Sequence, residues 1–301
     1  MWFRNLVVFR LPRPWQIDPA ELEQALARRA LQPCGALDHE TRGWLEPQRG
    51  RGYLHRVGGQ WLLRAGSEQK ILPAAVVRQF TEDRAEELER QQGFKPGRRQ
   101  LRELKERITD ELLPRAFSRR RSDWLWVDPE HGWLVVDAAS DNRAESVVEQ
   151  FREGVGELPA SRLDTERSPT AAMSEWLSEP SAATPFAIER ELELRAGDEE
   201  RATVRYLRHD LAGNEVAAHL AAGKRPTRLA LCFRERVSFV LTETGHLRRL
   251  AFLDLAREGL EAGERDAEAE FDAQFALMAA ELRQLLPELV DALGGERAAS
   301  A

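Results

Sequence analysis

The highest concentration of chemically active side chains in the sequence is a run of basic residues between Lys95 and Arg121. Ten residues of this segment are Lys or Arg and four are Asp or Glu, which gives a local charge of +6 in a chain of formal net charge −7. Guanidinium and ammonium groups gathered in this way can neutralise the phosphates of a nucleic acid. A solvated helix face with ion pairs four residues apart would have a similar composition. The excess of one sign favours contact with a polyanion over that alternative.

An α-helix is expected to carry part of this charge. Apolar residues recur at helical spacing between residues 101 and 112, so they share one face. At about 100° per residue, Arg98, Arg102 and Lys105 fall together on one flank of that face. Pro114 should end the helix, because its ring clashes with the preceding turn and it has no N–H to donate.

The segment after Pro114 is predicted to be a short basic loop. It places one large apolar residue, Phe117, among Arg115, Arg119, Arg120 and Arg121. The preceding helix is expected to begin after KILP at residues 70–73, with Val76, Val77, Phe80 and Leu88 facing inward. A Lys-Pro-Gly turn at residues 95–97 then separates the two helices, which predicts an αα-hairpin.

Strands and helices are predicted on both sides of this hairpin. Before it we expect a strand at residues 3–11, a helix from Pro19 and a β-hairpin around Gly58-Gly59. After it we expect strands at residues 124–128 and 133–137, a helix at 142–151 and a connection at 154–185. The last part should contain strands at 186–194, 203–207, 228–233, 237–241 and 247–252, a helix at 214–222, and a final helix that Pro287 should kink or restart. Short links between neighbouring strands favour an α+β fold with mostly antiparallel sheets.

A second basic set lies on the predicted strands of this last part. Arginines that alternate along a strand place one sign of charge on one face of a sheet, where a phosphate backbone could lie. A polar outer face of the sheet explains them equally well. The set consists of Arg201, Arg205, Arg208, Lys224, Arg225, Arg228, Arg248 and Arg249.

The C-terminal end is acidic. From Asp254 onward, twelve Asp and Glu residues accompany four Arg residues, a balance of −8. Phosphate would be repelled by this end, so a polyanion should bind on one defined surface.

The sequence contains no pattern typical of an active site or a metal centre. It has no Walker loop, GxSxG elbow, HExxH or Rossmann glycine pattern. Its six histidines are scattered, and Cys34 and Cys232 are isolated. We therefore expect no enzyme activity, no metal and no cofactor. The opening segment MWFRNLVVFRL indicates a strand rather than a signal peptide, and no apolar run is long enough to span a membrane.

Several motifs together resemble one known family. The most specific is LLPRAFSR at residues 112–119. The others are WFRNLVVFRL, PCG followed by Gly43-Trp44, KILP, WVD with VVDAAS, SEW, HDL, LAL, LRRLAF and FDAQF. From Trp2 to Gly295 the chain resembles the bacterial recombination-associated protein family RdgC. It departs from the family pattern at residues 50–56 and at Pro287, which interrupts a helix expected to be continuous.

The resemblance implies a cytoplasmic, nucleoid-associated protein that binds DNA without sequence preference and restrains the recombinase RecA. It also implies a closed homodimer, in which two elongated subunits meet at both ends to form a ring around duplex DNA, with single-stranded DNA as the open alternative. Each contact between the subunits would be isologous. The expected modules are a central α+β domain at 1–72 and 122–160, a protruding helical hairpin with its basic loop at 73–121, and an α+β base domain at 161–301.

On this model the basic residues would contact phosphate, and base edges would not be read. The expected DNA-binding residues are Lys70, Arg98, Arg102, Arg115, Arg119, Arg120, Arg205, Arg208, Lys224 and Arg228. Phe117 would be a hydrophobic plug in the partner subunit at one contact of the ring, and packing onto its own helix hairpin is the alternative. The competing function is a protein-interaction scaffold that contacts RecA through the acidic C-terminal helix, with incidental DNA affinity.

Overall fold

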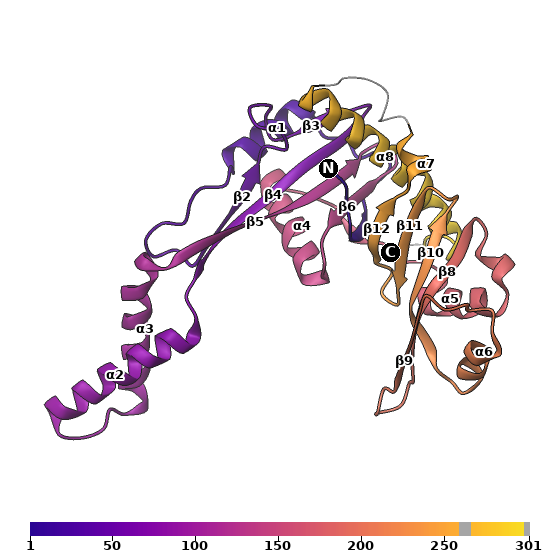
Figure 1. Ribbon diagram of the computed structural model, residues 1–301. Helices are drawn as coiled ribbons and strands as arrows, with labels where there is room; N and C mark the ends of the chain where they lie inside the picture. The colour runs from indigo at the N-terminus through magenta and orange to yellow at the C-terminus, as the bar shows by residue number, and fades with distance from the viewer. Residues whose placement is uncertain (259–265, 298–301) are drawn as a thin grey trace.

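The computed structural model describes residues 1–258 and 266–297. In these residues, twelve strands form one sheet in the order β2-β4-β5-β6-β1-β12-β11-β10-β8-β9, with β3 paired to β4 and β7 paired to β1. Eight α-helices accompany the sheet, and the molecule has the outline of an arch (Figure 1). Helices α2 and α3 form one end of the arch, and β9 and α6 lie near the other. The predicted α+β class with antiparallel pairing is confirmed.

The N-terminal half of the sheet is covered on one face by α1 (Pro19–Arg28) and α4 (Asp141–Val155). Phe9, Leu63 and Phe151 belong to the buried cluster between these helices and the sheet. The strands of this half are β1 (Leu6–Arg10), β2 (Glu40–Leu45), β3 (His55–Val57), β4 (Gln60–Ile71), β5 (Phe117–Asp128), β6 (Trp133–Asp137) and β7 (Ser161–Arg162).

The C-terminal half contains every strand predicted for it. Its strands are β8 (Phe186–Arg195), β9 (Thr203–Leu207), β10 (Arg225–Phe233), β11 (Val237–Thr242) and β12 (Leu247–Phe252). Its helices are α5 (Pro169–Ser178), α6 (Asn214–Ala221), α7 (Asp254–Arg257) and α8 (Ala267–Ala292). Trp176 of α5 and Leu282 of α8 are buried with Phe233 of β10 in a cluster on one face of the sheet. In the described residues, no helix lies across the opposite face of β8–β12, which looks into the arch (Figure 1).

The two halves of the sheet meet at a narrow junction. Strands β1 and β12 share the single register pair Leu6↔Leu247, and the Leu250 N–H donates to the Arg4 carbonyl at 2.8 Å. Helix α8 runs along the outer side of the arch and spans this junction (Figure 1). Because residues of α8 contact both halves of the molecule, this helix stabilises the junction between them.

Pro287 does not interrupt α8, so the predicted restart of the helix at this residue is wrong. Pro287 has no N–H to donate to the carbonyl of Arg283, which leaves one helical hydrogen bond unmade. Leu285, Leu286 and Leu289 around it are buried, and their packing holds the helix against the sheet.

The predicted basic loop after Pro114 is also wrong, because Phe117 already begins β5. Helix α3 ends at Leu112, as expected, and one 3₁₀ turn follows. Every residue from Phe117 to Val127 then has a register partner in β4. The arginines have no apolar alternation to indicate a strand, and the backbone ladder with β4 creates the strand instead. We call this long two-stranded unit the β4–β5 ribbon.

Helices α2 (Ala74–Gln92) and α3 (Arg98–Leu112) follow one another at the end of the ribbon (Figure 1). Their shared core is small and centres on Val77, Leu104 and Ile108. Two of the four residues expected to face inward along α2 are exposed: Val76 at 36% and Phe80 at 46%. With so small a core, these helices leave apolar surface unburied.

Candidate nucleic-acid interface

Strand alternation divides the basic residues of the β4–β5 ribbon between its two faces. Arg120 lies opposite Glu68 in the register, and Lys70 lies opposite Ser118, so these four side chains share one face. Arg119 points to the other face. The structure therefore separates Arg119 from Arg120 and Lys70, which the sequence-based prediction had grouped together.

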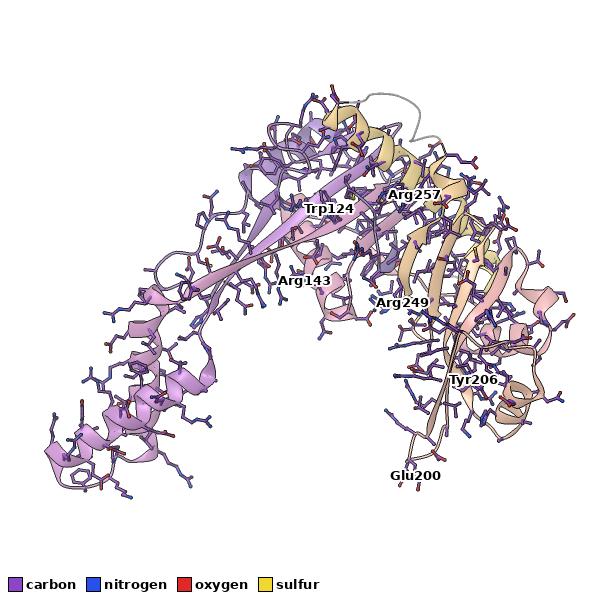
Figure 2. All side chains as sticks on the ribbon, in the orientation of Figure 1. Trp124, Arg143, Glu200, Tyr206, Arg249 and Arg257 are labelled. Atoms are coloured by element: carbon purple, nitrogen blue, oxygen red, sulfur yellow. The ribbon has the colours of Figure 1, made fainter. Side chains whose placement is uncertain are left out.

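The face that carries Arg119 looks into the arch. Arg121 and Asp123 share this face, because each is an even number of residues from Arg119. Asp123 accepts hydrogen bonds from the Nε and a terminal nitrogen of Arg143, at 2.9 and 2.5 Å. Arg143 belongs to α4, which lies on the inner side of the arch (Figure 2). Nothing in the sequence indicates this role for Arg143, because Asp123 and Ser67, to which it donates, lie 20 and 76 residues away in the chain.

A second row of charged residues crosses the inner face of the C-terminal half. Glu193 of β8 is the register partner of Arg205 in β9 and of Arg228 in β10, so the three side chains stand side by side. Arg195 lies two residues along β8 on the same face, and its guanidinium is 3.3 Å from the Glu193 carboxylate. Arg205, Arg195 and Arg228 thus form a cluster around one acid.

Arg248 and Arg249 extend this surface along β12. Arg249 has a φ of 53°, and the register between β11 and β12 shifts at this point. The resulting bulge turns Arg249 toward Glu191, with which it forms an ion pair. An open depression of about 790 Å³ lies here, and Leu207 and Arg208 are among the residues that line it. Figure 2 shows Arg249 on the inner side of the arch, across from Arg143.

We define the inner arginine set as the arginines that the fold brings to this concave side. The set consists of Arg119, Arg121, Arg143, Arg195, Arg205, Arg228, Arg248 and Arg249. Of the ten residues predicted to bind DNA, it contains Arg119, Arg205 and Arg228, and Arg208 lines the depression beside it.

The remaining predicted residues lie on other elements. Arg98 and Arg102 are exposed on α3, and Arg115 is exposed in the turn that follows. Arg102 is 3.7 Å from Glu106, an i,i+4 pair of the kind that a solvated helix face carries. Lys224 lies in the turn between α6 and β10.

Phe117 projects from the start of β5 and is 85% exposed. It therefore does not pack onto its own helices, and that alternative is wrong. Several other exposed apolar side chains belong to the same end of the molecule: Ile71, Phe80, Phe94 and Leu101. Apolar residues gathered in this way are typical of a surface that meets another protein.

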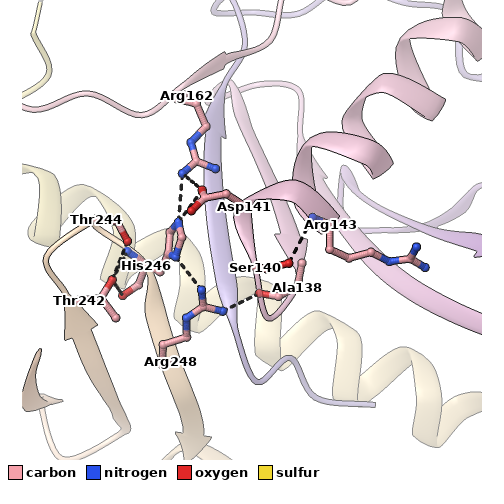
Figure 3. A network of polar contacts seen from close by, with 9 residues as sticks. All are labelled: Ala138, Ser140, Asp141, Arg143, Arg162, Thr242, Thr244, His246 and Arg248. Carbon is pink, nitrogen blue, oxygen red and sulfur yellow. Dashed lines mark hydrogen bonds and ion pairs between the residues drawn. The ribbon is translucent and has the colours of Figure 1, made fainter.

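A polar network fastens the two halves of the molecule next to the β1–β12 junction (Figure 3). The buried His246 lies between Asp141 at the start of α4, with Nε2 2.9 Å from Oδ1, and Arg248 of β12, 2.7 Å from Nδ1. Arg248 can only donate to Nδ1, so the ring proton lies on Nε2 and faces the Asp141 carboxylate, to which Arg162, 3.0 Å from Nε2, also donates. A terminal nitrogen of Arg248 also donates to the Ala138 carbonyl at 2.8 Å.

This network favours a neutral imidazole. Burial first, and then the charges of Arg248 and Arg162, lower the pKa of His246, while Asp141 opposes them. A second proton on Nδ1 would point at the Arg248 guanidinium and break the hydrogen bond between them. Arg248 is thereby held in a fixed place on the inner side of the arch.

Within residues 1–258 and 266–297, no three His, Cys, Asp or Glu side chains converge in a way that could hold a metal ion. Among the same residues, no helix is long and apolar enough to cross a membrane.

Comparison with known proteins identifies relatives along the whole chain. The family model described as "Putative exonuclease, RdgC" matches residues 1–296. A protein of Dechloromonas aromatica named recombination-associated protein RdgC is 48% identical over 299 residues, which cover 98% of this chain and 98% of that protein. Proteins of the same name from Herminiimonas arsenicoxydans and Cupriavidus pinatubonensis are 45% and 47% identical, and each alignment covers 99% of this chain and at least 99% of the relative. The resemblance that the sequence motifs indicated is confirmed.

Proposed function

The chain belongs to the RdgC family of recombination-associated proteins, and on this premise we propose that it binds DNA without sequence preference and restrains RecA-promoted recombination. We take the binding form to be a ring-shaped homodimer around duplex DNA, located on the nucleoid in the cytoplasm. The ligand is the phosphate backbone, and the protein acts by occupying DNA rather than by changing it.

The observation that carries this proposal is the inner arginine set. Its members come from β5, α4, β8, β9, β10 and β12, elements that are far apart in the chain and share one concave side. Guanidinium groups bind phosphate oxygens through paired N–H donors and need no base contact to do so. A protein of net charge −7 that keeps arginines on its concave side would attract DNA there and repel it elsewhere.

The ends of the arch support the closed dimer. Phe117 and the exposed apolar residues of α2 and α3 lie at one end, and the edge strand β9 lies near the other. If each end meets its own copy, two arches enclose a hole lined by both inner arginine sets. Such contacts are isologous, which gives a closed dimer rather than a filament.

The name of the family model mentions an exonuclease, and a binding role without catalysis is our proposal. Metal-assisted hydrolysis of a phosphodiester needs carboxylates that converge on the metal ions. The absence of such a group from residues 1–258 and 266–297 supports binding alone. End-labelled duplex incubated with the protein and Mg²⁺ or Mn²⁺ should keep its length, and progressive shortening would overturn this part of the proposal.

The scaffold alternative relies on acidic residues of α8 that face a partner. Four of the six acids in this helix are already used within the chain: Glu268, Asp272, Glu281 and Glu288 pair with Arg51, His55, Arg236 and Arg234. These four contacts hold α8 against both halves of the molecule. Acids that are paired within the chain are less available to a protein partner, which favours DNA binding over the scaffold.

Charge reversal separates the two functions. We expect the double variant Arg119→Glu, Arg121→Glu to lose duplex binding and, with it, inhibition of RecA-promoted strand exchange. Arg28→Glu with Arg49→Glu is the control, since both arginines are exposed and lie outside the inner arginine set. Inhibition that survives the loss of DNA binding would instead support direct contact with RecA.

A further inference from the structure

Glu193, which lies between Arg195, Arg205 and Arg228 of the inner arginine set, is buried although Arg205 beside it is exposed. The Glu193 side chain is only 5% exposed, whereas Arg205 beside it is 64% exposed. Its Oε1 accepts a hydrogen bond from the Thr227 hydroxyl at 2.7 Å, and its Oε2 accepts one from Arg205 at 2.6 Å. Both oxygens therefore have fixed partners.

The nitrogen that Arg205 uses in this contact is Nε. Its two terminal nitrogens, which make up the outer edge of the guanidinium, have no hydrogen-bond partner among residues 1–258 and 266–297. Arg236 shows the other arrangement: Nε and one terminal nitrogen both contact Glu281, and the other terminal nitrogen donates to the Leu255 carbonyl. Arg236 is fully engaged within the protein, and Arg205 presents a vacant donor pair to solvent.

Glu193 remains ionised in this position. Burial opposes its charge, but hydrogen bonds from Thr227 and Arg205 and the positive charge of Arg228 leave the pKa of this carboxyl below its usual value. One buried negative charge thus holds together a row in which Arg195, Arg205 and Arg228 would otherwise repel one another.

We propose that Glu193 is a positioning residue for phosphate binding. It holds Arg205 by Nε and keeps the terminal donor pair directed into the arch, where that pair meets phosphate oxygens in a bidentate contact. It also keeps Arg195 and Arg228 beside Arg205, so one carboxylate positions three guanidinium groups. The inference rests on the proposed DNA-binding function and adds an acidic residue to the residues that serve it.

The proposal predicts an effect opposite in sign to that of simple charge. Glu193→Gln removes a negative charge from the DNA-facing side, which by electrostatics alone should tighten binding. If Glu193 positions Arg205, the loss of a fixed side chain instead weakens duplex binding by roughly three- to tenfold. The slope of log affinity against log salt should become shallower by about 1, because one phosphate contact is lost.

Glu243→Gln is the matched control. Glu243 is 42% exposed and pairs with a terminal nitrogen of Arg195, so its loss removes the same charge from the same region without releasing Arg205. We expect Glu243→Gln to bind duplex as tightly as the unmodified protein or more tightly. A Glu193→Gln variant that binds as tightly as Glu243→Gln would overturn the proposal, since Glu193 would then only neutralise Arg205.

A double-mutant cycle tests whether Glu193 acts through Arg205. In an Arg205→Gln background, Glu193→Gln should weaken binding less than it does in the unmodified protein and should not lower the salt slope further, whereas an equal loss in both backgrounds would contradict the mechanism. Circular dichroism and thermal unfolding check the fold of each variant. If Glu193→Gln does not fold, Thr227→Val replaces it under the same criteria, because it removes the hydroxyl that fixes the carboxylate. Failure of the unmodified protein to bind duplex would overturn the proposed function itself.

Discussion

At the scale of single residues, Phe117 gives the clearest prediction about the dimer. We expect Phe117→Ala to weaken dimerisation by roughly ten- to a hundredfold, because burial of a phenyl ring contributes about 1.5–3 kcal/mol. The side chain is 85% exposed in the subunit, so the thermal unfolding temperature of the monomer should not change. Sedimentation analysis over a range of concentrations measures the effect. Leu255→Ala is the control, since Leu255 is 41% exposed and lies on α7, away from both ends of the arch (Figure 1). An unchanged dissociation constant of the dimer would contradict the proposal that Phe117 is a hydrophobic plug in the partner subunit.

His246 predicts how stability depends on pH. Its pKa is lowered in the folded protein, so the folded state binds fewer protons than the unfolded state as the pH falls. The contribution of neutral His246 to folding stability is therefore complete above its pKa in the unfolded chain, about 6.5, and it is lost as the pH falls toward its lower pKa in the folded protein. Gln can donate to Asp141 as the imidazole does and cannot gain a proton. We expect His246→Gln to lose less stability than the unmodified protein between pH 7 and pH 5, measured by urea unfolding.

Part of the loss of stability between pH 7 and pH 5 should remain in the His246→Gln variant. Burial also lowers the pKa of His55, which lies between α8 and the N-terminal half and adds a contribution of the same sign. Parallel pH profiles for the variant and the unmodified protein would show that protonation of His246 does not strain the junction.

Residue roles were the least predictable part of the site. Arg119 and Arg120 are adjacent and chemically identical, and nothing in the sequence distinguishes them until strand pairing sends them to opposite faces. Arg143 and Glu193 could not be recognised because their partners come from other elements. Phe117 was recognised, since a lone aromatic residue among arginines stands out in any secondary structure.

At the scale of elements, α8 is the part on which the fold most depends. Leu282 is fully buried between this helix and the sheet. We expect Leu282→Ala to lower the free energy of unfolding by about 2–5 kcal/mol, through lost apolar contact and the cavity left behind. Leu255→Ala, at a 41% exposed position in α7, should cost much less. Denaturant unfolding compares the two, and equal losses would mean that α8 does not hold the halves together.

Elements with a clear apolar period were predicted well. The five strands of the C-terminal half and helices α1, α4 and α6 appear close to their expected bounds, because buried faces impose a period of 2.0 or 3.6 residues. The ribbon was missed because its outer part buries little and depends on backbone pairing between β4 and β5. The continuity of α8 through Pro287 was missed because tertiary packing outweighs the local loss of one hydrogen bond.

At the level of the whole molecule, the arch determines where the charged segments of the chain lie relative to one another. The sequence indicated a basic segment, a basic strand set and an acidic end, but not their relative positions. The fold brings arginines of both halves to one concave side and places α8 along the outer side. Segregation of this kind requires contacts between distant parts of the chain, so local patterns could not predict it. We propose that this concave side binds the DNA backbone.

The dependence of duplex affinity on salt concentration, measured with two unrelated sequences of equal length, tests whether the concave side binds the DNA backbone. Counterion release predicts a slope of log affinity against log salt near −0.9 for each phosphate neutralised. We expect a steep slope, shared by both sequences, because the arginines contact phosphates and do not read bases. A flat slope, a strong preference for one sequence, or no binding at low salt would show that the concave side does not bind the DNA backbone.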